Sequence, residues 1–153
     1  MRIITRLVIC LVLTLSASLA VQAQSSTHAA ELQLLASVNR VRQAQGLPGL
    51  RWNDALALAA RRHAGLMAQH GAAEHGFAGE PGLAARAAQA GAHFVSLSEN
   101  VAQGSAVETI HAEFLGSPNH RANMLDSDID SIGIGIVERG GQLFAVEDFS
   151  KAR

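Results

Sequence analysis

Cysteine is nearly absent from this chain of 153 residues: the single cysteine, Cys10, lies in an apolar stretch close to the N-terminus. The rest of the chain therefore has no disulfide, no thiol nucleophile and no sulfur ligand for a metal. Such a domain depends on its core, and about 130 residues suffice because a chain of that size buries roughly two-thirds of its unfolded surface. We expect one domain over residues 24–153.

The first 23 residues have the pattern of an export signal. Arg2 and Arg6 precede an apolar run over residues 7–19, and Val21-Gln22-Ala23 places small residues where a signal peptidase cleaves. The run is short for a membrane span, so we expect cleavage after Ala23, with an uncleaved anchor as the alternative. The product would be secreted or periplasmic, with no transmembrane segment.

Positive charge and aromatic side chains are also scarce. Once Arg2 and Arg6 are removed with the signal, ten of the twelve lysines and arginines remain, against thirteen acidic residues, and the chain has no tyrosine. The absence of a basic run and the scarcity of aromatic surface argue against a nucleic-acid partner. The catalytic motifs Gly-x-Ser-x-Gly and His-Glu-x-x-His are missing, as is a phosphate-binding glycine loop.

An aspartate repeat, Asp126-x-Asp128-x-Asp130, begins like a calcium-binding loop. A calcium loop needs glycine at its sixth position and glutamate at its twelfth, where this chain has Ser131 and Val137. The repeat therefore predicts a polar turn before a strand.

Apolar spacing predicts helices in the first half of the chain. We expect helices over 28–45, capped by Ser26 or Thr27, over 54–70 with Asn53 as N-cap, and over 81–90. A strand over 93–101 follows.

The second half alternates between helix and strand signals. Ser105 and Glu108 predict a capping box that starts a helix ending at Gly116, and Ser117-Pro118 predicts another helical start. Isoleucines then alternate with Gly133 and Gly135, which predicts a strand whose glycine face lets another element pack closely. A hairpin turn over 139–142 and a strand over 143–149 complete an α+β fold, a small antiparallel sheet covered by helices.

Three separated polar stretches stand out, because a packed core does not require them. They contain His75, Glu99 and His120, which together provide two imidazoles and one carboxylate. By contrast His63 lies on the apolar face of its helix and is interpreted as a core histidine with one satisfied N–H. We interpret Asn100, like Arg121 and Asn123, as structural.

Several motifs occur in the order found in one protein family. They are Val38-Asn39-Arg40 with Gly46-Leu47-Pro48, Leu50-x-Trp52-Asn53, Ala60-x-x-His63-Ala64, Glu99-Asn100-Val101-Ala102, Ser117-Pro118-Asn119-His120-Arg121-Ala122-Asn123-Met124-Leu125, Ile132-Gly133-Ile134-Gly135 and Asp148-Phe149. Together they resemble the CAP superfamily of cysteine-rich secretory, antigen 5 and pathogenesis-related domains, in its bacterial secreted branch. The resemblance covers nearly all of residues 30–149.

The resemblance implies an α-β-α sandwich with about three antiparallel strands and a cleft lined by histidines and acids, which in some members holds a divalent metal. By position, His75, His120 and Glu99 would line this cleft and ligate a metal such as zinc. Ser117 stands where eukaryotic members have a second glutamate, so the fourth group of that site is missing. His111 is an additional candidate for the cleft.

Phe114 replaces a usual tryptophan of the family, and Asn119 replaces a usual glycine. His120 would lie near a helix N-terminus, which favours its neutral form. Serine catalysis by Ser117 with His120 is disfavoured, because this serine is better used as a helix cap.

Three functions remain open at this point. The leading hypothesis is a secreted, non-catalytic binding domain whose ligand is a lipid, a cell-wall glycan or a protein, because no activated nucleophile is evident. The second is a metal-dependent hydrolase using His75, Glu99 and His120, with a zinc-bound water as nucleophile. The third is a structural envelope protein with a vestigial cleft.

Overall fold

The computed structural model describes residues 26–152, so the predicted signal peptide lies outside the described residues. No helix within this range is both long enough and apolar enough to cross a membrane.

Four strands form one sheet in the order β1-β3-β4-β2. Strands β2 (Phe94–Gly104), β3 (Ser131–Arg139) and β4 (Gln142–Ala152) are antiparallel, which confirms the predicted three-stranded core of the sheet. The short strand β1 (Arg51–Trp52) pairs in parallel with β3 and was not predicted, because two residues carry no alternation signal.

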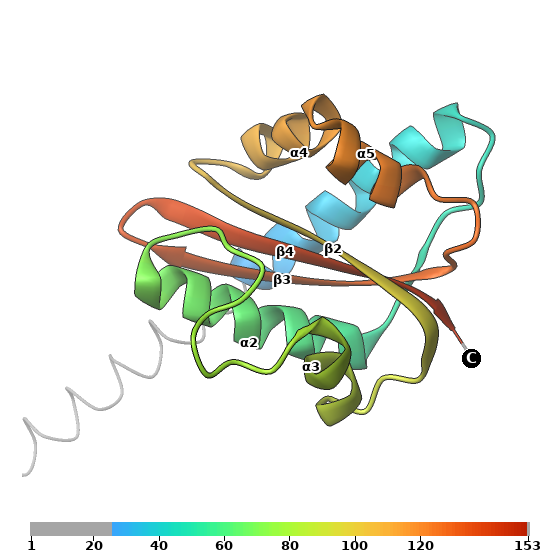
Figure 1. Cartoon of the computed structure of the whole chain (residues 1–153). Coiled ribbons are helices and arrows are strands. Elements are labelled where there is room, and N and C mark those ends of the chain that lie inside the picture. Colours follow the sequence, from blue (N-terminus) through green and yellow to red (C-terminus); the bar gives the residue numbers. More distant parts are fainter. Residues whose placement is uncertain (1–25, 153) are drawn as a thin grey trace, which may run out of the picture.

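Helices cover both faces of this sheet (Figure 1). On one face lie the N-terminal helix (residues 26–44), α4 (Val107–Gly116) and α5 (Pro118–Leu125). On the other face lie α2 (Asp54–His70) and α3 (Leu83–Gln89). The predicted α-β-α sandwich is therefore confirmed.

The register of the strands divides the core between the two faces. Val101 pairs with Val146, and both pack with Ala60 of α2. Ile134 and Ile136 belong instead to the cluster under α4 and the N-terminal helix. Because successive side chains of a strand point to opposite faces, each strand contributes to both layers.

The glycine face of β3 confirms the predicted close approach. An added Cβ on Gly133 would lie 2.1 Å from the backbone nitrogen of Ala57, and one on Gly135 would lie 2.2 Å from that of Arg61. Helix α2 therefore lies with its backbone directly against the strand, where only glycine leaves room.

The helix starts were predicted with mixed success. Asn53 accepts hydrogen bonds from two backbone N–H groups at the start of α2, as expected. Residues 26 and 27 already lie inside the N-terminal helix, so neither is its cap. The capping box does not form: α4 begins at Val107, which places Ser105 one residue too early, and Glu108 accepts a hydrogen bond from Gln33 instead. Helix α3 begins at Leu83, two residues later than predicted.

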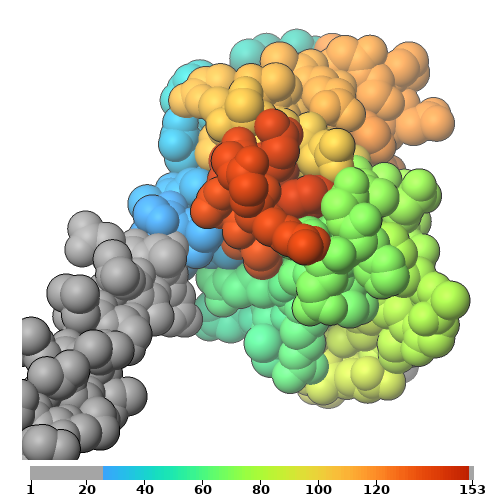
Figure 2. All heavy atoms as spheres, turned by 90° about the vertical axis from the view of Figure 1, so that its left-hand side faces the viewer, coloured from blue at the N-terminus to red at the C-terminus, as the bar shows by residue number. Residues whose placement is uncertain are grey.

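The β3–β4 hairpin extends between the two helical layers, as Figure 2 shows. Gly140 and Gly141 both have positive φ, which a tight hairpin turn requires. The side chain of Arg139 donates to the carbonyl oxygens of Ala68 and Gln69, which satisfies the C-terminal end of α2. The turn predicted over 139–142 is thereby confirmed.

Candidate functional site

Strand β2 is an edge strand, and the candidate site forms around its middle. Glu99 lies within the strand and is buried. His75 approaches from the loop between α2 and α3, and His120 lies in the first turn of α5 on the opposite face. The backbone oxygen of His120 accepts a hydrogen bond from Asn100, the neighbour of Glu99 in β2, and repulsion from a charged His75 contributes to lowering the pKa of His120.

Glu99 orients His75. The Nδ1 atom of His75 lies 2.8 Å from Oε1 of Glu99. A carboxylate oxygen accepts hydrogen bonds, so Nδ1 carries the hydrogen and the neutral ring has its lone pair on Nε2. The His75 side chain is 63% exposed, whereas that of Glu99 is 4% exposed. A buried carboxylate thus fixes an imidazole that solvent can reach.

Arg86 holds the other oxygen of Glu99, a role that the sequence did not reveal. Its Nη2 donates to Oε2 of Glu99. Its Nη1 lies 3.3 Å from each of two backbone carbonyl oxygens, those of His75 and Pro81. Only 6% of Arg86 is exposed. One guanidinium therefore joins α3, the edge strand and the loop that carries the exposed histidine.

His63 extends this network beneath the site. It is fully buried, with Nδ1 2.7 Å from Oε1 of Glu80 and Nε2 2.8 Å from the carbonyl oxygen of Glu74. Its Nε2 also lies 3.9 Å from Oε2 of Glu99. The interpretation as a satisfied core histidine is confirmed, but the glutamate that pairs with it was missed. The loop from Glu74 to Glu80 is tied to α2 through this ring.

Two asparagines attach α5 to the edge of β2. Asn123 Nδ2 donates to the backbone oxygen of Glu99 at 3.2 Å and to Oδ1 of Asn100 at 2.9 Å. Asn100 Nδ2 donates in turn to the backbone oxygen of His120 at 3.1 Å. The structural roles predicted for both asparagines are confirmed, and they set the position of the second imidazole.

The ring of His120 is held in an environment that favours its neutral form. Burial is the main cause that lowers its pKa, followed by the charge of His75, while Glu113 opposes the shift. The ring meets Phe114 edge-on, with centroids 5.2 Å apart. The predicted direction agrees, but its cause is burial rather than the helix N-terminus. Its Nδ1 is buried without a hydrogen-bond partner among residues 26–152.

Two adjacent acids of β4 lie buried below the site. Asp148 pairs with Glu99 across the strands, and burial, then the charge of Glu99, raises its pKa well above the usual range, with Arg86 opposing. Glu147 points to the other face, where burial raises its pKa to about 8 although Asn100 donates to it. Glu147 is therefore mostly protonated at neutral pH.

The remaining predicted residues have other surroundings. Ser117 Oγ lies 3.5 Å from the backbone nitrogen of His120, so its hydroxyl caps α5 as predicted. His111 lies on α4, where burial and the charge of Arg40 lower its pKa. Within residues 26–152, His111 makes no hydrogen bond with Glu99 or with either histidine of the site.

The fit of a divalent metal can be tested on Glu99, the one predicted carboxylate ligand. Both of its oxygens are engaged, one with His75 and one with Arg86. In the part of the chain that the structure describes, no group of three or more histidine, cysteine, aspartate or glutamate side chains is arranged to hold a metal ion. In this arrangement the residues do not fit a metal centre.

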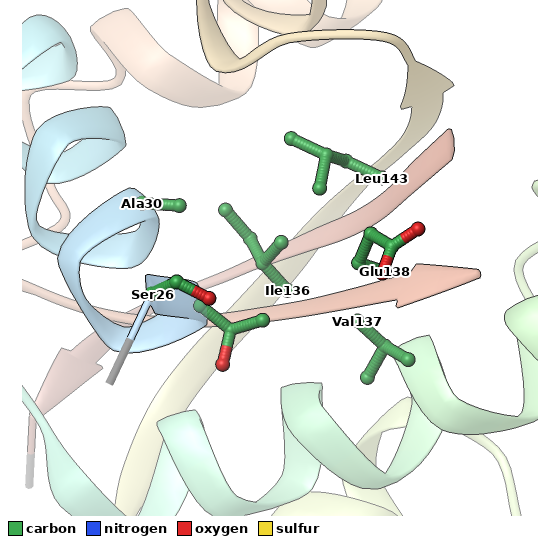
Figure 3. Close-up of a pocket in the computed structure, with 7 residues that line it drawn as sticks. Ser26, Ala30, Ile136, Val137, Glu138 and Leu143 are labelled. Atoms are coloured by element: carbon green, nitrogen blue, oxygen red, sulfur yellow. The ribbon is translucent and has the colours of Figure 1, made fainter. Parts of the chain in front are cut away.

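An apolar groove of about 390 Å³ lies elsewhere, between the start of the N-terminal helix and the hairpin (Figure 3). Leu143 of the groove is five residues from Asp148 along β4, which is roughly 17 Å of extended strand, so the groove lies away from the part of β4 that pairs with Glu99. It is lined by Ser26, Thr27, Ala30, Ile136, Val137, Glu138 and Leu143.

Comparison with curated proteins gives no match. Solved structures do match. One is an extracellular SCP-domain protein of Bacillus anthracis, with a TM-score of 0.78 and 22% identity over 84% of this chain and 42% of that one. Another is an outer surface protein of Borrelia burgdorferi, with a TM-score of 0.76 and 21% identity over 83% of this chain and 96% of that one. A cysteine-rich secretory protein of Staphylococcus aureus also matches, with a TM-score of 0.66 and 22% identity over 82% of this chain and 39% of that one. The chain thus spans less than half of the Bacillus and Staphylococcus proteins, and at these identities the likeness concerns the fold.

A sequence model of the cysteine-rich secretory protein family, CAP, matches residues 35–149. That range includes the edge strand, both histidines of the site and the network that holds them. The chain belongs to the cysteine-rich secretory protein family.

Proposed function

We propose that this protein is a secreted binding domain that recognises a polar cell-wall glycan at the site of His75, Glu99 and His120, without catalysing a reaction. The names of the Bacillus and Borrelia relatives, an extracellular protein and an outer surface protein, support an extracellular location. The chemistry of the site supports the polar ligand.

The observation that carries the proposal is the fixed, exposed imidazole of His75. Because Nδ1 is engaged by Glu99, the neutral ring offers Nε2 as an acceptor for a ligand hydroxyl. Because the buried carboxylate already orients the ring, the entropic cost of ordering this side chain when a ligand binds is smaller. A hydroxyl-rich glycan matches such a site better than an alkyl chain does.

Catalysis has less support from these residues. The hydroxyl of Ser117 is engaged as a helix cap, which leaves it poorly placed to act as a nucleophile. Glu99 is neutralised by Arg86 and occupied by His75, so it is not free to act as a general base. The hydrolase hypothesis therefore lacks both a ready metal centre and a ready base.

The test is co-sedimentation of the purified protein with insoluble peptidoglycan. Wild type should sediment with the glycan, and the His75→Ala/His120→Ala variant should remain in the supernatant. His93→Ala is the matched control, because this exposed histidine lies before β2 and outside the site. Equal sedimentation of all three proteins, or none by wild type, would reject the proposal.

The apolar groove supports lipid binding as a second candidate function. Its volume of about 390 Å³ and its lining by Ala30, Ile136 and Leu143 suit an alkyl chain. Mass spectrometry of an organic extract of the purified protein would detect a bound lipid. Ala30→Trp would obstruct the groove and should abolish such binding, while the histidine variant should retain it.

A further inference from the structure

Arg86 occupies the position at which a cation bound to Glu99 would lie. One oxygen of Glu99 accepts from His75 Nδ1, and the other accepts from the guanidinium. Both Arg86 and Glu99 are buried, with 6% and 7% of their surfaces exposed. The carboxylate therefore has a positive partner built into the chain.

The guanidinium serves a second carboxylate as well. Its Nη1 lies 3.8 Å from Oε1 of Glu80, which itself pairs with His63. A buried carboxylate is costly unless it is paired and hydrogen-bonded. The planar fork of arginine presents five donors in a fixed geometry, whereas a lysine presents three on one freely rotating ammonium group. One side chain thus compensates two buried acids.

A divalent ion at Glu99 would have to displace this pairing. The displaced guanidinium would then be left buried with the backbone oxygens of His75 and Pro81 and with the more distant carboxylate of Glu80. Removing the close partner of a buried ion pair is unfavourable, because the remaining buried charge is then poorly compensated. The network therefore opposes metal binding by the same residues that the family resemblance suggested as ligands.

We propose that Arg86 is the internal cation of this site: it takes at Glu99 the place that a divalent metal would take, and it positions His75 through Glu99. This inference rests on the proposed function only in that both concern the same site. Its tests use the protein without a glycan, so a failure to bind peptidoglycan and a failure of this inference are separate results.

The first test is calorimetric titration of zinc into protein expressed from the full chain. Wild type should show no saturable one-to-one binding. Arg86→Met releases Oε2 of Glu99 and should bind one zinc ion with an affinity at least about tenfold above the weakest that the titration detects, and adding His120→Ala should remove this binding. One-to-one binding by wild type that His75→Ala abolishes would overturn the inference, as would the absence of one-to-one binding by Arg86→Met.

The second test separates positioning from a general structural role. Nitrogen NMR of the neutral His75 ring should place its hydrogen on Nδ1 in wild type, because Glu99 accepts there. In Arg86→Met the carboxylate loses its anchor, and the hydrogen should redistribute between Nδ1 and Nε2. An unchanged Nδ1–H form in this variant would overturn the positioning role.

Arg42 provides the matched control. It is 1% exposed, and its guanidinium donates to the backbone oxygens of Pro48, Met124 and Asp126, none of which belongs to the network around Glu99. Arg42→Met should lose stability yet keep His75 in the Nδ1–H form and, like wild type, show no one-to-one zinc binding. If Arg86→Met does not fold, Arg86→Lys keeps the charge and should remain unresponsive to zinc, and one-to-one binding by that variant would overturn the inference.

Discussion

Replacing Gly133 with alanine tests the contact between α2 and β3, on which the α2 side of the site depends. The added methyl group would lie 2.1 Å from the backbone nitrogen of Ala57 and 2.3 Å from the carbonyl carbon of Leu56. Ordinary van der Waals contact begins at 3.4 Å, so α2 would have to move away by more than about 1 Å. No rotamer change can relieve the clash, because the nearest atoms are backbone.

The expected cost is at the upper end of the range for overpacked cores. Inserting a methylene into a packed core typically costs about 1–3 kcal/mol, and here a whole helix must shift. We expect Gly133→Ala to lower the free energy of unfolding by about 3 kcal/mol or more. The midpoint of thermal unfolding should then fall by about 10 °C.

The consequence should extend to the site. Gly133 lies beside Asp148, which in turn pairs with Glu99, so all three face α2. A displaced α2 also carries His63 away from Glu99. We therefore expect weaker peptidoglycan binding even under conditions in which Gly133→Ala remains folded.

The assay is urea unfolding followed by circular dichroism, with Gly65→Ala as control. Gly65 lies within α2, and an added Cβ there would meet nothing within 4 Å. Alanine is the better helix former, so the control should be about 0.5–1 kcal/mol more stable than wild type. A loss below about 1 kcal/mol in Gly133→Ala, alongside a normal control, would refute the reasoning.

Three further changes probe other parts of the fold. Glu31→Ala removes a 1%-exposed carboxylate that accepts from Arg61 and from the backbone N–H of Ile136, and urea unfolding should show a loss of about 2–3 kcal/mol; a loss within error would contradict this. Asn53→Ala removes the N-cap of α2 and should cost about 1 kcal/mol by the same assay, whereas an unchanged midpoint would show that the cap is dispensable. Glu147 has a pKa of about 8 in the folded protein, against 4.5 ordinarily. Between pH 4.5 and pH 8 the unfolded chain therefore binds fewer protons than the folded one, and the free energy of unfolding falls as the pH rises through this range. Relative to wild type, Glu147→Gln should therefore become more stable by up to about 4 kcal/mol between pH 5 and pH 8; a pH-independent difference would contradict the burial argument.

Local signals in the sequence determined the elements and much of the layering. Asn53 and Ser117-Pro118 start helices because their side chains or rings satisfy the geometry of the first turn without help from the rest of the fold. The alternation of isoleucine with Gly133 and Gly135 specified a strand with one close-packed face. Each of these signals is contained within a few consecutive residues.

The candidate site was predicted only in part. The sequence singled out His75, Glu99 and His120, and the structure brings these residues to the middle of one edge strand. It did not show that Glu99 is buried and already paired, and the metal hypothesis depended on that carboxylate being free. Arg86 appeared in the sequence as one polar residue of a short helix, with no local sign of its partner.

The tertiary structure alone decided which charges meet. Arg86 and Glu99 are 13 residues apart, and Arg61 and Glu31 are 30 apart, with no shared motif. Glu147 and Asp148 stand in a strand whose two faces are both covered, so their burial follows from the layers above and below rather than from their own neighbours. Electrostatic energies depend on burial and on distance in space, and a chain acquires both only when its layers pack.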